Sequence, residues 1–502
     1  MNLESILEML KQKFATQFGT NIIVKVVTMI AGFVVARIAG PTVLGTISYG
    51  TSYVSIWLFL TGIFAAGHMK LVSEGRDHGD CVATYVWLKT LSILLFIIVV
   101  LSWLAFQLNV KHIGFEAENQ IAVILVILVA SVITQFYNIV SNSYTAMLMQ
   151  AKANLPFVLQ TIVFHAGRIV VVLLGARAIG LALWQVAALI IVLPVLIKYF
   201  RELPFGRVDK VLLSKYLYYG FPTFLLSAVH SVLQFADKLV LAHYSSVEEL
   251  GYYAAAMSIG GTMLVLSNSI GTIFFPLFSS LLQNNNWDEV NKKNKLYQEF
   301  NTLFILPLIL LLALIAEPVL TTVLGSRYQH SVLPFKIIVI STYIVIVGMP
   351  YGNILTGMGR FYANVWINAS QLLVFIVSIT FFVSPKYLNL GATGLALNLM
   401  ITYLYRNGAY VYVSSRIGSL KYDKSNFLRI VVILLMSLLF WAVSARVQAV
   451  FTYWWLVIVP VYMTSVYVVL YSLKLLTRQH INTLLELMNI KKTSSYIKSE
   501  LS

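Results

Sequence analysis

Polar residues recur every three or four positions inside several long apolar stretches of this sequence. Residues with that spacing share one face of an α-helix, so each set predicts a polar stripe on an otherwise apolar helix. For any single stripe the alternative is helix packing, in which an interhelical hydrogen bond contributes about 0.6 to 2 kcal/mol. The side chains on or beside these stripes that could hold an anion or move a proton are Asn21, Lys25, Gln135, Asn138, His165, Arg168, His230, Asp237, Lys238 and Arg406.

Charged side chains inside the apolar stretches are harder to explain by packing. An Arg, Lys or Asp at the centre of a membrane helix costs about 2.5 to 3.5 kcal/mol on insertion scales. Lys25, Arg168 and Arg406 stand on polar stripes as unpaired cations, whereas Lys89 is expected to extend its ammonium group to the membrane surface. If the stripes converge, the three cations line a water-filled cavity. Such a cavity would favour a phosphate or diphosphate, which guanidinium and ammonium groups bind through charge-assisted hydrogen bonds.

The neighbours of these cations are expected to complete the anion site. Asn21, Gln135, Asn138, His165 and Lys238 are the further candidates for contact with the substrate. Asp237 directly precedes Lys238, and the two charges could compensate each other in part. Adjacent residues on a helix point about 100° apart, however, so the pair need not form.

Membrane-spanning helices are the elements that must position these residues. Of the 502 residues, 59% are hydrophobic and 11% are charged, and the mean hydropathy is +0.83, far above that of a soluble domain. Apolar runs of about 20 residues recur from Gln17 to Leu476, which favours helical spans over barrel strands. The fourteen expected spans begin near Gln17, Gly45, Val82, Asn119, Asn154, Ala178, Ser214, Leu250, Gln298, Val332, Phe361, Leu390, Asn426 and Thr452.

The basic residues predict how these spans are oriented. An even number of spans places both termini on one side, and the loops and termini of that side hold 22 Lys and Arg against five in the opposite loops. Both termini are therefore expected to be cytoplasmic. The net charge of +16 is spread between apolar segments, so anionic lipid head groups are the expected partners and nucleic acid is not. Cys81 is the only cysteine, which excludes an intrachain disulfide and a cysteine-based metal cluster.

The arrangement of the spans predicts two lobes and no catalytic domain. The connecting loops are too short for a soluble domain, and none carries the residues that a glycosyltransferase or polymerase would need. A weak repeat relates Val43–Tyr49 to Glu249–Ala255, 206 residues apart, which indicates parallel repeats. The expected segments are an interfacial helix over 1–16, a six-span lobe over 17–200, a second six-span lobe over 214–413, two further helices over 426–476 and an amphipathic tail over 477–502.

Four stretches carry a resemblance to a known family. ARIAGPTVLGTISYG at 36–50, FADKLVLAHYSSVEELGYYAAA at 235–256, FFPLFSS at 274–280 and IAEPVLTTVLGSRY at 315–328 resemble the Wzx-type polysaccharide flippases. These flippases belong to the polysaccharide-exporter branch of the multidrug/oligosaccharidyl-lipid/polysaccharide (MOP) superfamily. None of the four is a catalytic signature.

The resemblance implies both a fold and a cargo. The fold would be two six-helix lobes around a cationic cavity that opens alternately to each side of a bacterial inner membrane. The cargo would be an undecaprenyl-diphosphate-linked oligosaccharide, such as an O-antigen repeat unit, handled beside a polysaccharide polymerase and a chain-length regulator. A cation gradient would drive transport, with Asp237 and His230 as candidates for coupling to H⁺ or Na⁺ and no other cofactor or metal.

Two related transporters remain as alternatives. A flippase for a peptidoglycan precursor, lipid II, would share the lipid carrier and the cavity charge. A multidrug antiporter for cations is disfavoured, because it calls for buried carboxylates and the expected spans hold mainly buried cations.

Overall fold

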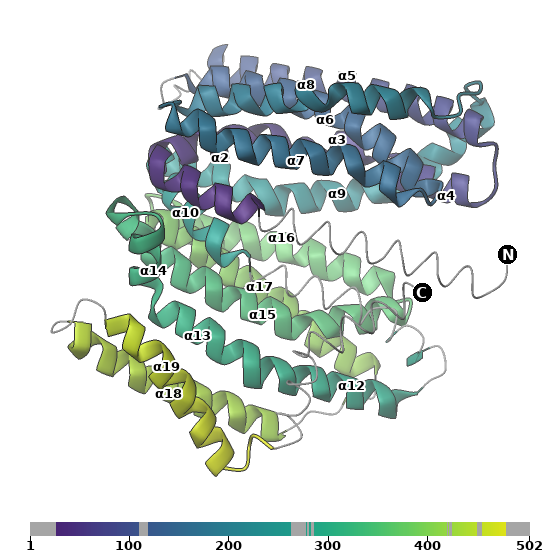
Figure 1. Ribbon diagram of the computed structural model, residues 1–502. Helices are drawn as coiled ribbons and strands as arrows, with labels where there is room; N and C mark the ends of the chain where they lie inside the picture. The colour runs from purple at the N-terminus through teal and green to yellow at the C-terminus, as the bar shows by residue number, and fades with distance from the viewer. Residues whose placement is uncertain are drawn as a thin grey trace. The chain divides into compact units, whose positions relative to one another are not determined.

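The computed structural model describes residues 27–109, 119–262, 278, 281–282, 286–418, 420, 424–448 and 454–477. Nearly all of these residues are helical, and these ranges contain no strand (Figure 1). The predicted fold class, an all-α protein that crosses the membrane many times, is confirmed. The predicted interfacial helix over 1–16 lies outside the described residues, as does the predicted tail apart from residue 477.

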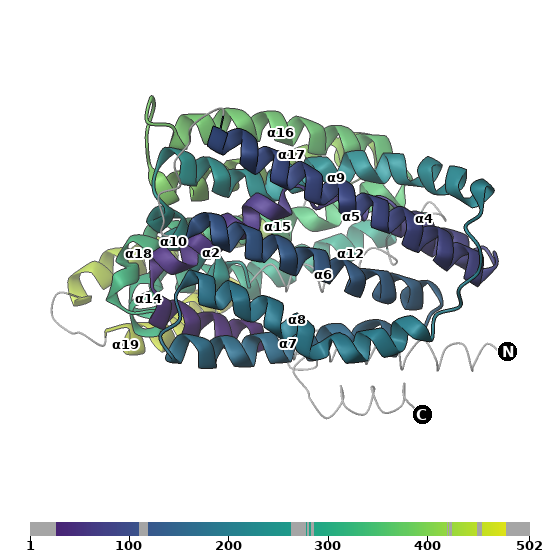
Figure 2. The same ribbon diagram turned by 90° about the horizontal axis from the view of Figure 1, so that it is seen from above.

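The chain divides into two compact units between Ala254 and Ala255. The first unit begins with a helix over Val27–Ala39. It continues with α2 (Pro41–Ser55), α3 (Phe59–Gly62), α4 (Ala65–Ser73), α5 (His78–Asn109), α6 (Gln120–Ala146), α7 (Gln150–Leu173), α8 (Ala178–Arg201), α9 (Lys210–Tyr244) and the first part of α10 (Val247–Gly260). Figure 2 shows α6, α7 and α8 of this unit running alongside one another. Fully buried apolar side chains such as Val54, Phe96 and Val123 join α2, α5 and α6.

The second predicted span is bent. Helix α2 and the segment Phe59–Ser73 meet at an angle of 47°. The carbonyl groups of Thr61 and Ile63 lie where α3 gives way to α4, and side chains from other helices bond to both of them. Thr223 of α9 donates its hydroxyl to Ile63 at 3.1 Å. Such substitute donors are what a broken helix needs in a membrane, because lipid offers none.

Two glycines let α2 and α10 approach each other closely within the first unit. A Cβ at Gly45 would overlap the backbone carbonyl of Val247, and a Cβ at Gly251 would overlap that of Pro41. Gly45 and Gly251 are 206 residues apart, and so are Pro41 and Val247. The contact is therefore reciprocal, as two segments related by the predicted repeat would make it.

The second unit holds the other helices of the described residues. They are the rest of α10, α12 (Trp287–Phe300), η1 (Asn301–Ile305), α13 (Leu306–Leu314), α14 (Ala316–Val323), η2 (Ser326–Ser331), α15 (Val332–Gly357), α16 (Phe361–Val383), α17 (Gly391–Ile417), α18 (Lys424–Gln448) and α19 (Trp454–Ser472). Helix α17 packs closely on both α15 and α16. The expected ninth span begins earlier than predicted, because the polar helix α12 runs into it through the π-helical segment η1.

Ten described helices are long and apolar enough to cross a membrane, or eleven if the bent α2–α4 segment counts as one span. Three further predicted spans fall on Val27–Ala39, α10 and α17, of which the first two are shorter and α17 is less apolar. The total of fourteen therefore stays a prediction. The predicted lobe boundaries stay predictions as well.

Candidate functional site

Lys89 of α5 lies among polar groups of the first unit and not at the membrane surface. Lys89 is 2% exposed, and its Nζ donates to the Thr61 carbonyl and to Gln135 Oε1, the latter at 3.0 Å. Asn138 Nδ2 donates to the same Gln135 oxygen at 3.3 Å. The expectation that Lys89 reaches the surface is wrong, because the break between α3 and α4 supplies the Thr61 carbonyl as an acceptor inside the unit. Gln135 and Asn138 come together as predicted site residues, around this additional cation.

Helix α7 places His165 and Arg168 one turn apart. His165 is 7% exposed; its Nε2 lies 3.1 Å from Thr28 Oγ1, and its buried Nδ1 has no hydrogen-bond partner in the described residues. The half-buried Arg168 holds its guanidinium 5.1 Å from the centre of the Phe164 ring, a cation–π contact. Within the described ranges no carboxylate forms an ion pair with Arg168.

Asp237 and Lys238 of α9 form an ion pair with each other. The Lys238 ammonium lies 3.0 Å from Asp237 Oδ1 and also donates to the Gln234 carbonyl. Asp237 is 5% exposed, so the pair shields a carboxylate that would be costly alone. His230, two turns earlier on the same helix, is exposed. The roles in coupling expected for Asp237 and His230 stay predictions.

Arg406 is the predicted site residue of the second unit. It is half-buried on α17, and its guanidinium lies 5.0 Å from the centre of the Tyr403 ring. The Nε atom of Arg406 is buried without a hydrogen-bond partner among the residues described. The remaining candidates, Asn21 and Lys25, lie outside the described residues. That Lys25, Arg168 and Arg406 share one cavity stays a prediction.

A buried ion pair in the second unit was not expected. Arg429 Nη1 of α18 lies 2.7 Å from Glu299 Oε1 of α12, and Arg429 Nε donates to the Leu475 carbonyl at 3.0 Å. The Arg429 and Glu299 side chains are 6% and 9% exposed. Both residues lie near the ends of their predicted spans, where a charged side chain is normally exposed to water. The sequence does not predict their ion pair, because it depends on how α12, α18 and the segment after α19 pack together.

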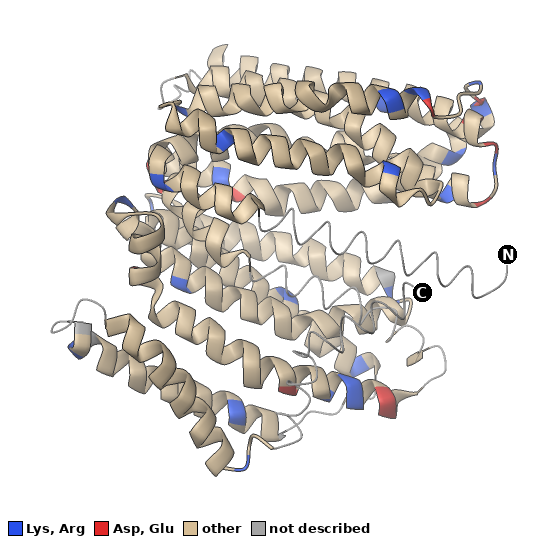
Figure 3. Cartoon of the chain, in the orientation of Figure 1, with Lys and Arg blue, Asp and Glu red and all other residues tan. Residues whose placement is uncertain are grey.

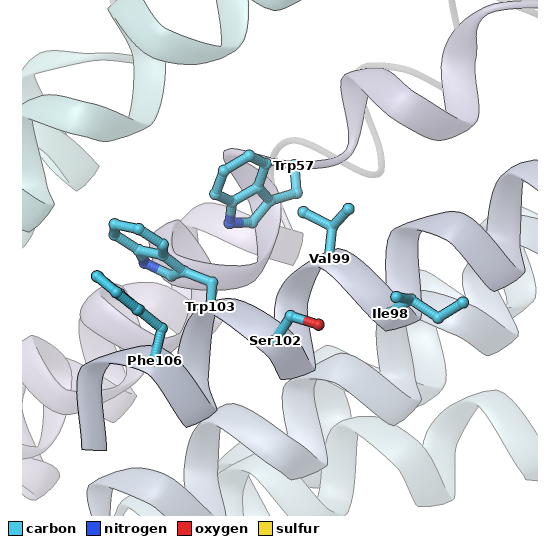
Figure 4. A pocket seen from close by; sticks show the side chains of 6 residues that line it. All are labelled: Trp57, Ile98, Val99, Ser102, Trp103 and Phe106. Atoms are coloured by element: carbon cyan, nitrogen blue, oxygen red, sulfur yellow. The ribbon is translucent and has the colours of Figure 1, made fainter. Parts of the chain in front are cut away.

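Most Lys and Arg residues lie toward the ends of their helices (Figure 3). An open hollow of about 400 Å³ in the first unit carries none of them. It is lined by Trp57, Ile98, Val99, Ser102, Trp103 and Phe106, with the aromatic rings grouped on one side (Figure 4). With a single hydroxyl on its wall, this hollow does not suit a phosphate. The described residues also hold no group of three His, Cys, Asp or Glu side chains that could bind a metal ion.

Comparisons with known proteins identify solved structures that share this fold. The structure of lipid II flippase MurJ in an inward closed conformation is similar to this chain, with a TM-score of 0.72 and 14% sequence identity. The match covers 90% of this chain and 97% of the MurJ chain. An inward-facing multidrug resistance MATE family transporter of the MOP superfamily is also similar, with a TM-score of 0.65 and 14% sequence identity. That match covers 78% of this chain and 94% of the transporter chain. No curated protein matches the sequence. The chain therefore shares its fold with this lipid II flippase and with this MATE family transporter.

A comparison of the sequence with family models shows the family of this chain. Residues 34–333, more than half of the chain, match a family model described as a polysaccharide biosynthesis protein. The chain belongs to this family, and it is a multi-pass membrane protein.

Proposed function

We propose that this protein is a flippase that moves an undecaprenyl-diphosphate-linked oligosaccharide, such as an O-antigen or other surface-polysaccharide repeat unit, across the bacterial inner membrane. Membership in a polysaccharide biosynthesis family supports a saccharide cargo, and the MOP fold supports transport. A polysaccharide polymerase and a chain-length regulator would act on the delivered unit. Both termini are cytoplasmic in this proposal, as the distribution of Lys and Arg favours.

The main support for the proposal is which buried charges have a partner of opposite charge and which do not. Asp237 and Glu299, the buried carboxylates among the described residues, are each held by a cation. Arg168 and Arg406, in contrast, contact aromatic rings and form no ion pair within the described ranges. Guanidinium groups left without an anion inside a membrane protein are suited to an anionic ligand. A diphosphate head group supplies that charge, whereas a cationic drug would be repelled.

The mechanism follows from the two parts of such a cargo. The diphosphate and sugars would pass along the polar side chains while the lipid tail stays in the bilayer. Alternating access would expose the head group first to the cytoplasm and then to the outside. A cation gradient would supply the driving force, with Asp237 exchanging its bond to Lys238 for a coupling H⁺ or Na⁺.

Transport in vesicles tests the proposal. The full-length protein is reconstituted with a lipid-linked oligosaccharide, and arrival of the head group on the far side is measured with and without a proton or sodium gradient. We expect Arg168→Ala and Arg406→Ala to lower the flipping rate at least about tenfold, since a charge-assisted hydrogen bond contributes about 1.5 to 3 kcal/mol. Arg416→Ala is the matched control, because Arg416 also lies over a tyrosine, Tyr412, but is exposed.

The outcome separates this cargo from its alternatives. No flipping of the oligosaccharide by the wild-type protein would overturn the proposal. Flipping of lipid II alone would identify a peptidoglycan-precursor flippase. Equal loss in all three arginine variants would show that Arg168 and Arg406 contribute only general positive charge.

A further inference from the structure

A network of polar side chains joins α15, α16 and α17 in the second unit. Tyr410 of α17 donates its hydroxyl to Asn364 Oδ1 at 2.6 Å, and Asn364 Nδ2 donates to Thr356 Oγ1 of α15 at 3.3 Å. Asn368, one turn further along α16, donates to Asn364 Oδ1 at 3.0 Å. These residues are half-buried, with Thr356 in the last turn of α15 and Asn364 in the first turn of α16. The Tyr410 ring packs against α15 at Gly352.

Three buried atoms beside this network have no hydrogen-bond partner among the described residues. They are Asn353 Nδ2, Gln371 Oε1 and Arg406 Nε. Each belongs to a residue three or four positions from a network member on its own helix, and so lies on the same face. We call the seven residues the amide seam: Asn353, Thr356, Asn364, Asn368, Gln371, Arg406 and Tyr410. From Asn364 to Gln371 the seam extends about 10 Å along α16.

The types of the unpartnered atoms indicate which ligand would satisfy them. Asn353 Nδ2 and Arg406 Nε are donors, whereas Gln371 Oε1 is an acceptor. A phosphate only accepts hydrogen bonds and would leave the Gln371 carbonyl unmatched, and a hydrocarbon tail would match none of the three. A sugar hydroxyl both donates and accepts. Several hydroxyls on one ring can therefore satisfy donors and acceptors spaced along a helix.

We propose that the amide seam binds the sugar hydroxyls of the cargo and sets the preference for its saccharide. The inference rests on the proposed function and gives the seam a role of its own. Arg168 and the terminal nitrogens of Arg406 would act on the diphosphate, and the polar side chains of the seam, with Arg406 Nε, would act on the sugars. Each hydrogen bond to a sugar hydroxyl would contribute about 0.5 to 1.5 kcal/mol, so a cargo with hydroxyls at these positions is preferred over one without them.

Binding of two lipids by the purified full-length protein tests this assignment. One lipid is the lipid-linked oligosaccharide extracted from the cells that make this chain, and the other is undecaprenyl diphosphate without sugar. We expect the wild-type protein to prefer the first lipid. Asn353→Leu and Gln371→Met should each reduce that preference about threefold to tenfold, the value of one hydrogen bond. Binding of undecaprenyl diphosphate should not change, whereas Arg168→Ala should weaken binding of both lipids.

Stability without ligand separates recognition from packing. Gln371→Met removes an unsatisfied buried group at similar volume, so the melting temperature should stay the same or rise. The control is Asn398→Leu, because Asn398 Oδ1 on α17 already accepts a hydrogen bond from Ser378 at 2.6 Å. That variant should melt at a lower temperature and keep the full preference for the sugar-bearing lipid.

The possible results point to different failures. If the seam variants keep the wild-type preference, or if the wild-type protein has none, the seam holds water or packs helices and the inference is wrong. If the wild-type protein binds neither lipid, the proposed function itself fails.

Discussion

Lys89 and Gln135 form a buried pair with unequal members. The ammonium of Lys89 is a full charge, and its described partners are an amide oxygen and a backbone carbonyl. Loss of Lys89 leaves two neutral acceptors, whereas loss of Gln135 leaves a buried cation with fewer acceptors. The two partners should therefore not be equally tolerant of substitution.

Single and double variants of this pair measure the inequality. We expect Lys89→Met to cost about 1 to 3 kcal/mol of stability. Gln135→Leu should cost more than Lys89→Met, because the buried ammonium keeps its charge and loses an acceptor, and a hydrogen bond to a charged group contributes about 1.5 to 3 kcal/mol. The double variant should be more stable than Gln135→Leu alone. Thermal unfolding in detergent provides the comparison, and equal losses from the two single variants would contradict the assigned hydrogen bonds.

At the residue scale, the sequence predicts which side chains are unusual better than it predicts their partners. Spacing on a helix groups Gln135 with Asn138, which a hydrogen bond joins, and it singles out Arg168 and Arg406, whose role at a binding site stays a prediction. It does not show that Lys89 faces Gln135, because that contact depends on the register between α5 and α6. The amide seam is also only partly visible, since the link from α16 to Tyr410 joins residues far apart in the chain.

An ion pair between Glu299 of α12 and Arg429 of α18 joins the two helices. Arg429→Met should destabilise the protein by about 3 to 5 kcal/mol, because the buried Glu299 carboxylate loses the Arg429 guanidinium. Replacing both residues with Met should recover much of that loss. Lys292→Met, which breaks the exposed Lys292–Glu289 pair, should change stability by less than about 1 kcal/mol. Melting temperatures measured at one pH and salt concentration decide between these outcomes, and a double variant as unstable as Arg429→Met would refute the pairing.

The approach of α2 to α10 depends on two glycines. Gly45→Ala and Gly251→Ala each place a methyl group against a backbone carbonyl, which cannot move as a side chain does. Each should lower stability by about 1 to 3 kcal/mol through overpacking. Gly32→Ala is the control, because no atom of the described residues lies within 4 Å of a Cβ built at Gly32, and alanine favours a helix. Losses of the same size in all three variants would mean that the effect is not specific to this contact.

At the element scale, hydrophobic length predicts helices well and their internal breaks poorly. The predicted starts at Ala178, Val332 and Phe361 coincide with those of α8, α15 and α16. The bend between α2 and α4 could not be predicted from a proline, because there is none between Ser55 and Phe59. Packing against other helices supports that bend, because Lys89 and Thr223 bond to the carbonyls near it.

At the scale of the whole molecule, the number of crossings between α9 and α12 decides which parts of the chain face the cytoplasm. Helix α10 has 14 residues and spans about 21 Å, less than the roughly 30 Å of a hydrocarbon core. The predicted eighth span therefore needs residues beyond Gly260 to cross. If it crosses once, eight spans separate Arg76 from Arg360, and both lie on the cytoplasmic side.

Single cysteines placed in the Cys81→Ser protein test this count, since Cys81 is the only native cysteine. Arg76→Cys and Arg360→Cys should resist a membrane-impermeant maleimide in intact cells and react after permeabilisation. Arg177→Cys and Lys386→Cys should react in both cases, because the loops with few Lys and Arg face outward. All four side chains are exposed, so burial does not limit their reaction. If the eighth span does not cross, the labelling of Arg360→Cys and Lys386→Cys would be reversed, while that of Arg76→Cys and Arg177→Cys would stay the same. The excess of Lys and Arg would then no longer lie on one side of the membrane.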